Sequence, residues 1–223
     1  MRTFIMVLLG SCLGSFYYLA IIRSERGEEF IISRSHCEYC QRELSWWEMI
    51  PVISYLLLKG KCRKCQQPIN KGHLYAEAAG LMISLLTGDN TRLFILFNII
   101  FIIDIYDALY QEIPLQWFLI LALYCLTCGF DINSVLLLVV PLSVLCLLAK
   151  GMGAGDIILL GCLANVFGLA HSLRAIIISC GVTGLYMLVK KQGKTAFCPF
   201  LTAGFLIEIK LFKEVFDLLP PFM

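Results

Sequence analysis

The sequence predicts an all-α polytopic membrane protein with about eight transmembrane helices and a small polar loop domain between the first and the second. Composition is the first reason: 59% of the 223 residues are hydrophobic, 15% are charged, and the mean hydropathy is +0.82. Soluble domains have a more polar composition. The second reason is a series of apolar runs of roughly bilayer length, and the third is a polar stretch with four paired cysteines. The net charge of +2 is too small to indicate nucleic-acid binding.

The expected spans start at the N-terminus. The run at 3–22 follows Arg2, as a secretory signal would, but it is long and no small-x-small cleavage site follows it, so we expect a retained helix. The other expected spans are 74–88, 92–109, 114–130, 134–149, 156–170, 174–189 and 198–216.

Half of the basic residues lie in one loop. Of the 18 Lys and Arg residues, nine fall within 23–71, and the positive-inside rule places such a loop in the cytoplasm and the N-terminus outside. Counting onward places 110–113 and 150–155 inside and 171–173 outside. We therefore expect a multi-pass protein whose basic loop lies against the anionic headgroups of the lipid bilayer.

Four cysteines of this loop form two C-x2-C turns, "CEYC" at 37–40 and "CRKC" at 62–65. Each such turn presents two thiolates to one side, and two turns complete the tetrahedral site that zinc prefers. A pair of disulfides is the alternative, and the reducing cytoplasm disfavours it. We expect a cytoplasmic zinc-binding domain with ligands Cys37, Cys40, Cys62 and Cys65, in which zinc is structural because protein fills all four positions.

The segment between the two turns is apolar but too short to cross a bilayer, and Pro51 interrupts it. A crossing would also put the two cysteine pairs on opposite faces of the membrane. We expect Trp46 to Leu58 to be a re-entrant or interfacial element, with Trp46 and Trp47 at headgroup depth.

Asp104, Asp107 and Asp156 lie in or beside apolar runs. Asp104 and Asp107 share one face of the helix expected at 92–109, and Asp156 begins the span expected at 156–170. The topology places Asp107 and Asp156 at the same membrane face. Two carboxylates brought together in an apolar site share a proton, so that one acts as a base on water while the other donates to a carbonyl, which is aspartic proteolysis.

Two alternatives use the same acids. Each acid can lie at an interface and pair with a nearby cation, such as Lys150 for Asp156, or the acids can carry protons in a zinc-stabilised transporter or channel. The glycines at 151, 153 and 155 do not indicate a nucleotide site, since no strand precedes them and the sixth position is Asp. They are typical of backbone that packs closely at membrane depth.

Taken together, the motifs resemble those of the prepilin peptidases, or type IV leader peptidases, a family of intramembrane aspartyl proteases. The family pairs an Asp seven residues before a Pro with G-x-G-D, and Asp107 before Pro114 and Asp156 match these motifs. Further likeness lies in "GSFYYLAIIR" at 14–23, the W-E-x-I-P segment between the cysteine turns, "LYAEAAG" at 74–80 and "CPFLTAG" at 198–204.

The resemblance implies that Asp107 and Asp156 are catalytic and that the bacterial enzyme cleaves the leader of type IV prepilins or pseudopilins after a Gly, at the cytoplasmic face of the cell membrane. Larger members also methylate the new N-terminus with S-adenosylmethionine, and the four cysteines favour this second activity. Glu48 and Glu77 are acids at matching positions and candidates for methylation or for site shape. Asp104 would be a neighbour of the catalytic pair.

The implied organisation is a first transmembrane helix at 1–22, a cysteine domain at 23–73 and a peptidase domain at 74–223. Leu115 and Ile158 depart from the family, which commonly has Asp and Lys there. The compact length resembles the Gram-positive branch, which processes competence or type IV pilins. A pilus-assembly scaffold with a decayed site is a further alternative.

Overall fold

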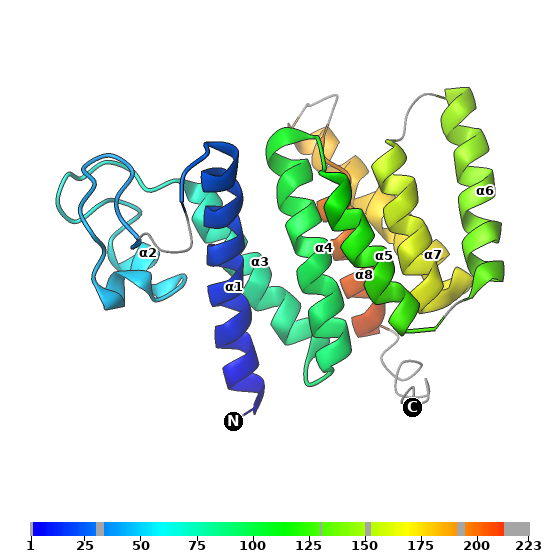
Figure 1. Ribbon diagram of the computed structural model, residues 1–223, viewed down its shortest axis with the longest axis horizontal. Helices are drawn as coiled ribbons and strands as arrows, with labels where there is room; N and C mark the ends of the chain where they lie inside the picture. Colours follow the sequence, from blue (N-terminus) through cyan, green and yellow to red (C-terminus); the bar gives the residue numbers. More distant parts are fainter. Residues whose placement is uncertain (1, 30–33, 130, 150–152, 191–194, 212–223) are drawn as a thin grey trace. The chain divides into compact units, whose positions relative to one another are not determined.

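The computed structural model describes residues 2–29, 34–129, 131–149, 153–190 and 195–211, and these residues form helices and loops without a strand. This confirms the predicted all-α class. Figure 1 shows the elements, which are α1 (Arg2–Glu25), the 3-10 helix η1 (Trp46–Met49), α2 (Ile53–Leu57), α3 (Lys71–Thr87), α4 (Thr91–Tyr110), α5 (Leu115–Thr127), α6 (Ile132–Ala149), α7 (Ala154–Lys190) and α8 (Cys198–Leu211).

Three helices of the described chain are long and apolar enough to cross a membrane: Phe4–Glu25, Thr91–Tyr110 and Ala154–Lys190. Shorter apolar helices cover Leu115–Thr127 and Ile132–Val144. Lys150, Gly151 and the end of the last expected span at 212–216 lie outside the described residues.

The expected connection at 171–173 is wrong. Residues 171–173 are helical, and the break in α7 falls at Gly168, with φ 78° and ψ 169°. Only glycine adopts this backbone conformation readily, because it has no Cβ. Figure 1 shows that the parts of α7 before and after this residue run in different directions, so the two spans expected at 156–170 and 174–189 are joined at a single residue.

The chain forms two compact units, Met1–Phe94 and Ile95–Met223, here called unit 1 and unit 2. In unit 1, α1 packs closely on α3. A Cβ at Gly10 would overlap Ser84, and one at Gly80 would overlap the carbonyl oxygen of Gly10. Small residues therefore allow the two backbones to approach each other, as is common where helices pack in membranes.

Unit 2 is built on α7 packed against α6 and α8. Gly204 of α8 lies so close to α7 that a Cβ there would overlap Ser179. Glu208 of α8 is fully buried, and its Oε1 accepts hydrogen bonds from the Nε of Arg174 at 3.1 Å and lies 2.7 Å from the Nδ1 of His171. These contacts hold α8 against α7 just after its break.

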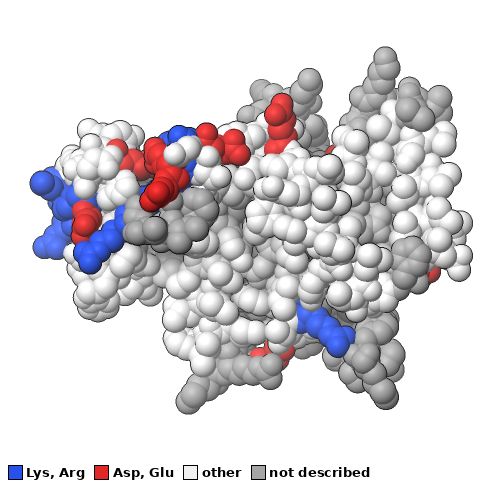
Figure 2. All heavy atoms as spheres, viewed as in Figure 1, with Lys and Arg blue, Asp and Glu red and all other residues white. Residues whose placement is uncertain are grey.

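The surface of the loop region differs from that of the helices. On the face seen in Figure 2, Lys, Arg, Asp and Glu side chains gather over the region of α2, whereas the surface over the long helices is mostly uncharged. Several apolar side chains of η1 and α2 are also exposed: Trp46, Met49, Ile53, Leu56 and Leu57.

We predict that Gly80→Ala lowers the free energy of unfolding by about 1–3 kcal/mol, because the new methyl group meets backbone atoms of Gly10 and Gly14 that cannot rotate away. Thermal unfolding in detergent measures this. Gly181→Ala in α7, where a Cβ meets nothing within 4 Å, is the control and should unfold like the parent protein. Equal stability of both variants would contradict the close packing of α1 on α3.

Candidate functional site

Asp107 and Asp156 are both held by Cys198 in unit 2. The backbone N–H of Cys198 donates to Oδ2 of Asp107 at 3.0 Å, and its thiol donates to Oδ1 of Asp156 at 3.3 Å. Asp107 lies in the last turn of α4, Asp156 in the first turn of α7, and Cys198 begins α8. Three helix ends thus bring together the two acids that the sequence singled out.

The ends of these helices have local causes. Ile113 precedes Pro114, and a residue before proline disfavours the helical conformation, so α4 ends soon after Asp107. At the start of α7, the backbone N–H of Gly153 donates to Oδ2 of Asp156 at 3.3 Å. This is half of a capping box, and the helix dipole favours an acid in this position.

Gly155 allows the start of α7 to lie against α5. A Cβ on this residue would lie 3.1 Å from the ring of Phe118. Of the three glycines before Asp156, Gly153 therefore donates a hydrogen bond to the acid, and Gly155 leaves space for the start of α7 beside α5. Gly151 lies outside the described residues.

Asp104 lies one turn before Asp107 on α4 and has a different partner. Its side chain is buried, and its Oδ1 accepts a hydrogen bond from the hydroxyl of Thr202 at 3.0 Å. Cys198 and Thr202 are four apart on α8 and so share a face. Two hydrogen-bonded pairs therefore join α4 to α8, Asp107 with Cys198 and Asp104 with Thr202.

Cys198 and Thr202 escaped the sequence analysis as site residues. Both are small residues in an apolar helix, where they are usually packing elements. The available signals were their four-residue spacing at the start of an apolar run and their place in "CPFLTAG" at 198–204. The departures Leu115 and Ile158 have exposed side chains.

The four loop cysteines come together in unit 1. Their sulfur atoms all lie within 4.8 Å of one another, with Cys37 3.8 Å from Cys65 and Cys40 4.0 Å from Cys62. A disulfide needs about 2.05 Å, whereas tetrahedral Zn–S bonds of about 2.3 Å put sulfur atoms about 3.8 Å apart. The cluster therefore fits one metal ion and leaves no ligand position open.

The two cysteine turns have the same backbone geometry. The N–H of Cys37 donates to the carbonyl of Arg42, and that of Cys62 to the carbonyl of Gln67, both at 2.9 Å. Gln41 and Gln66, which follow the second cysteine of each turn, have positive φ of 55° and 59°. Hydrogen bonds from the backbone of Cys65 and Lys64 lower the pKa of Cys62 to about 6, which favours the thiolate that binds metal.

Glu48 makes structural hydrogen bonds beside the cysteine cluster. Its oxygens accept two hydrogen bonds from the guanidinium of Arg42, at 2.6 and 3.0 Å, and a third from the N–H of Ser45 at 2.8 Å. The hydrogen bond with Arg42 holds the pKa of Glu48 below its usual value. Glu48 thus ties the first cysteine turn to η1.

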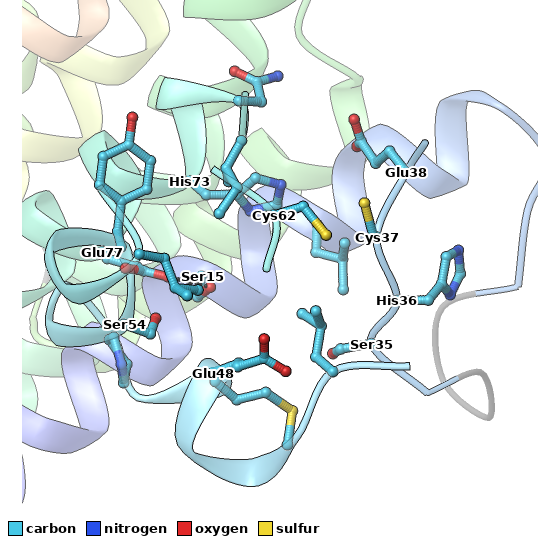
Figure 3. A pocket seen from close by; sticks show the side chains of 18 of the residues that line it. Ser15, Ser35, His36, Cys37, Glu38, Glu48, Ser54, Cys62, His73 and Glu77 are labelled. Atoms are coloured by element: carbon cyan, nitrogen blue, oxygen red, sulfur yellow. Dashed lines mark hydrogen bonds between the residues drawn. The ribbon is translucent and has the colours of Figure 1, made fainter. Parts of the chain in front are cut away.

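Glu77 lies on the wall of a cavity of about 310 Å³ in unit 1. Its Oε1 accepts from the hydroxyl of Ser15 on α1 at 2.8 Å, and its Oε2 accepts from the N–H of Val52 at 2.7 Å. Figure 3 shows the cavity with Glu77 and Ser15 side by side and with Glu48, Cys37 and Cys62 among its other lining residues.

The sequence of the chain is similar to those of known proteins. Residues 8–88 match the family model described as the bacterial peptidase A24 N-terminal domain. A prepilin leader peptidase/N-methyltransferase of Bacillus subtilis (strain 168) is 31% identical over 229 residues, covering 90% of each chain. A type 4 prepilin-like proteins leader peptide-processing enzyme of Escherichia coli O78:H11 (strain H10407 / ETEC) is 29% identical over 81% of this chain and 76% of its own.

A shorter match covers 32% of this chain and 30% of a prepilin leader peptidase/N-methyltransferase of Vibrio cholerae serotype O1, with 35% identity. No solved structure matches the chain. Fold and sites define an all-helical membrane protein with two acids at helix ends and a cluster of four cysteines that could hold a metal ion. The chain belongs to the prepilin leader peptidase/N-methyltransferase family.

We predict that the purified protein carries about one thiophilic divalent ion per chain, because four cysteine sulfurs already stand at ligand separation. Elemental analysis by mass spectrometry measures the stoichiometry. The double variant Cys62→Ser, Cys65→Ser should lose the ion, and Cys180→Ser, a change at an exposed cysteine of α7, should keep it. An unchanged metal content in the double variant would place the ion elsewhere.

Proposed function

We propose that the chain is a bacterial prepilin peptidase that cleaves the leader of type IV prepilins or pseudopilins after a Gly, with Asp107 and Asp156 as the catalytic pair. The observation that carries this proposal is that two acids far apart in the sequence are both held by Cys198. The names of the relatives in Bacillus subtilis and Escherichia coli point to the same chemistry.

The mechanism follows from the pairing of the acids. Two carboxylates close together in a site of low polarity share one proton and titrate as a unit. The ionised carboxylate takes a proton from water, which attacks the scissile carbonyl, and the protonated one donates to the carbonyl oxygen. Cys198 positions both groups for this exchange, while Asp104, paired with Thr202, stays outside it.

We also propose a multi-pass arrangement of about eight crossings in the bacterial cell membrane, with 1–22 as the first helix, 23–73 as a cytoplasmic domain and 74–223 as the peptidase domain. The basic residues of 23–71 support the orientation. The exposed apolar side chains of η1 and α2 support an interfacial position for this segment. Residues 212–223 of the third part lie outside the described chain.

The second proposed activity is methylation of the newly formed N-terminus, which the names of the relatives include. S-adenosylmethionine supplies an electrophilic methyl group on a sulfonium. Zinc is the proposed ion of the cysteine site, because thiolates in a closed tetrahedral set select it. Its role is structural, since Cys37, Cys40, Cys62 and Cys65 leave no position for substrate.

A proton-coupled transporter that uses the same acids is not favoured, because the relatives are named as leader peptidases. The scaffold hypothesis requires a decayed site, and both acids and their shared partner are present here.

The test of the catalytic pair is leader cleavage on co-expression with a candidate prepilin, followed by gel electrophoresis. Asp107→Asn and Asp156→Asn should each reduce cleavage by about 10³-fold or more, because an amide can neither take nor share the proton. Asp89→Asn, in the exposed connection between α3 and α4, is the control and should cleave normally. Cleavage by either catalytic variant at the parent rate would refute the assignment.

The bridging thiol gives a second prediction. Cys198→Val keeps the backbone donor to Asp107 but removes the thiol donor to Asp156, so cleavage should fall by about tenfold, whereas Cys198→Ser should stay within a few-fold of the parent. Because the bridge affects how the acids share a proton, the pH profile of the Val variant should also shift. A Val variant with the parent rate and profile would show that the contact has no positioning role.

A further inference from the structure

The cavity of unit 1 has the size and lining of a small-molecule site. Its volume is about 310 Å³, and binding sites of this size combine apolar walls with a few placed polar groups. The aromatic walls come from Phe16, Tyr39 and Tyr55, and the polar groups include Glu77 and His73. Aromatic faces attract cations.

Glu77 is a buried acid without a cationic partner. Its residue exposure is 9%, and its two hydrogen bonds come from neutral donors, the Ser15 hydroxyl and the Val52 N–H. Among the described residues no Lys, Arg or His lies within ion-pair distance of it, in contrast to Glu48 with Arg42. Arg23, Arg42 and Arg63 also line the cavity. A buried carboxylate without a counter-ion is costly, so a positively charged group of a ligand is favoured beside Glu77.

His73 lies one turn before Glu77 on the same face of α3, and both line the cavity. Its ring packs edge-on against Tyr18 of α1, with 4.8 Å between the ring centroids. Within the described chain the ring nitrogens make no hydrogen bond, whereas Nδ1 of His36 contacts the carbonyl of Arg34. Both ring nitrogens of His73 are therefore open to a partner in the cavity, and in the neutral ring one of them carries a lone pair that can accept a proton.

The electrostatic surroundings keep this ring neutral. Burial lowers the pKa of His73, and the charged groups that face it are Glu38 of the first cysteine turn, Glu77 of α3 and Arg23 of α1. Glu38 and Glu77 oppose the shift and Arg23 adds to it, and burial prevails. A neutral imidazole at neutral pH is a base.

We infer that this cavity binds the sulfonium methyl donor, S-adenosylmethionine, with Glu77 facing the positive sulfur and His73 taking the proton that the substrate amine must lose. The inference rests on the proposed methyl transfer and assigns it a site. His73 removes a proton from the α-ammonium group. The amine nitrogen then forms a bond to the methyl carbon, the C–S bond breaks, its electron pair stays on sulfur, and a neutral thioether leaves.

The first test compares two ligands that differ in charge at sulfur. Equilibrium binding of S-adenosylmethionine and of its thioether product, S-adenosylhomocysteine, should show at least about tenfold preference for the sulfonium in the parent protein. Glu77→Gln should remove this preference, and Glu77→Asp, which keeps the charge, should retain part of it. Glu112→Gln is the matched control and should keep the preference, because Glu112 is an exposed acid in the connection between α4 and α5 of unit 2, outside the cavity.

Equal binding of the two ligands by the parent protein, or an unchanged preference in Glu77→Gln, would overturn the assignment of Glu77. Leader cleavage reports whether each variant is folded, since the acids of the proposed catalytic pair lie in unit 2 and do not line the cavity. A folded Glu77→Gln variant that has lost the preference supports the site.

The second test follows methyl transfer to a synthetic peptide with the free N-terminus of a cleaved pilin, so that peptidase activity is not needed. In the parent protein the rate should rise with a midpoint below the ordinary histidine value of about pH 6.5, because burial lowers the pKa of His73. His73→Gln should be about 10²-fold slower, and its rate should rise only near pH 8, about where a free α-amine ionises by itself. Glu112→Gln, outside the cavity, should keep the parent profile.

A folded His73→Gln variant with the parent profile would overturn the role of His73, while the proposed function would stand. If the parent protein transfers no methyl group to the peptide but cleaves prepilins, the proposed methyltransferase activity and this inference both fail and the peptidase remains.

Discussion

The arrangement of this chain depends on how its buried acids are satisfied. An acid in an apolar environment is costly unless donors reach it, and in each case here a donor comes from another segment. Asp107 and Asp156 are held by the first residue of α8, Asp104 by Thr202, and Glu208 by the Arg174 side chain of α7. The same interactions join the helices of unit 2 and position the acids of its candidate catalytic site.

Close helix packing makes these hydrogen bonds possible. Side chains as short as those of Asp, Cys and Thr meet only where backbones approach, and glycine provides that approach. Gly204 lets α8 lie against α7, and Gly155 gives α7 room beside Phe118. A substituent at either position would move a helix that carries a donor or an acid, so stability and site geometry depend on the same few contacts.

Unit 1 uses the same principle for a different purpose. Glu48 is paired with Arg42 beside the cysteine cluster, whereas the side chain of Glu77 accepts hydrogen bonds from neutral donors, the Ser15 hydroxyl and the Val52 N–H, in a cavity that His73 also lines. Two acids that look equivalent in the sequence therefore have different chemistry. The difference favours a structural role for Glu48 and a ligand-facing role for Glu77.

The sequence by itself determined the helical class, because apolar runs dictate helices in lipid, and it identified the cysteine cluster and the acids, because C-x2-C pairs and lone acids in apolar runs are rare. The sequence predicted the break in α7 at the wrong residues, because a glycine such as Gly168 within an apolar helical pattern gives no sign that its φ is positive. Only the tertiary structure decided that Cys198 holds both acids, that Thr202 donates to Asp104, and that Glu77 has no counter-ion among the residues that the structure describes. These are contacts between segments distant in the chain, and their geometry depends on how closely whole helices pack, which no local pattern encodes.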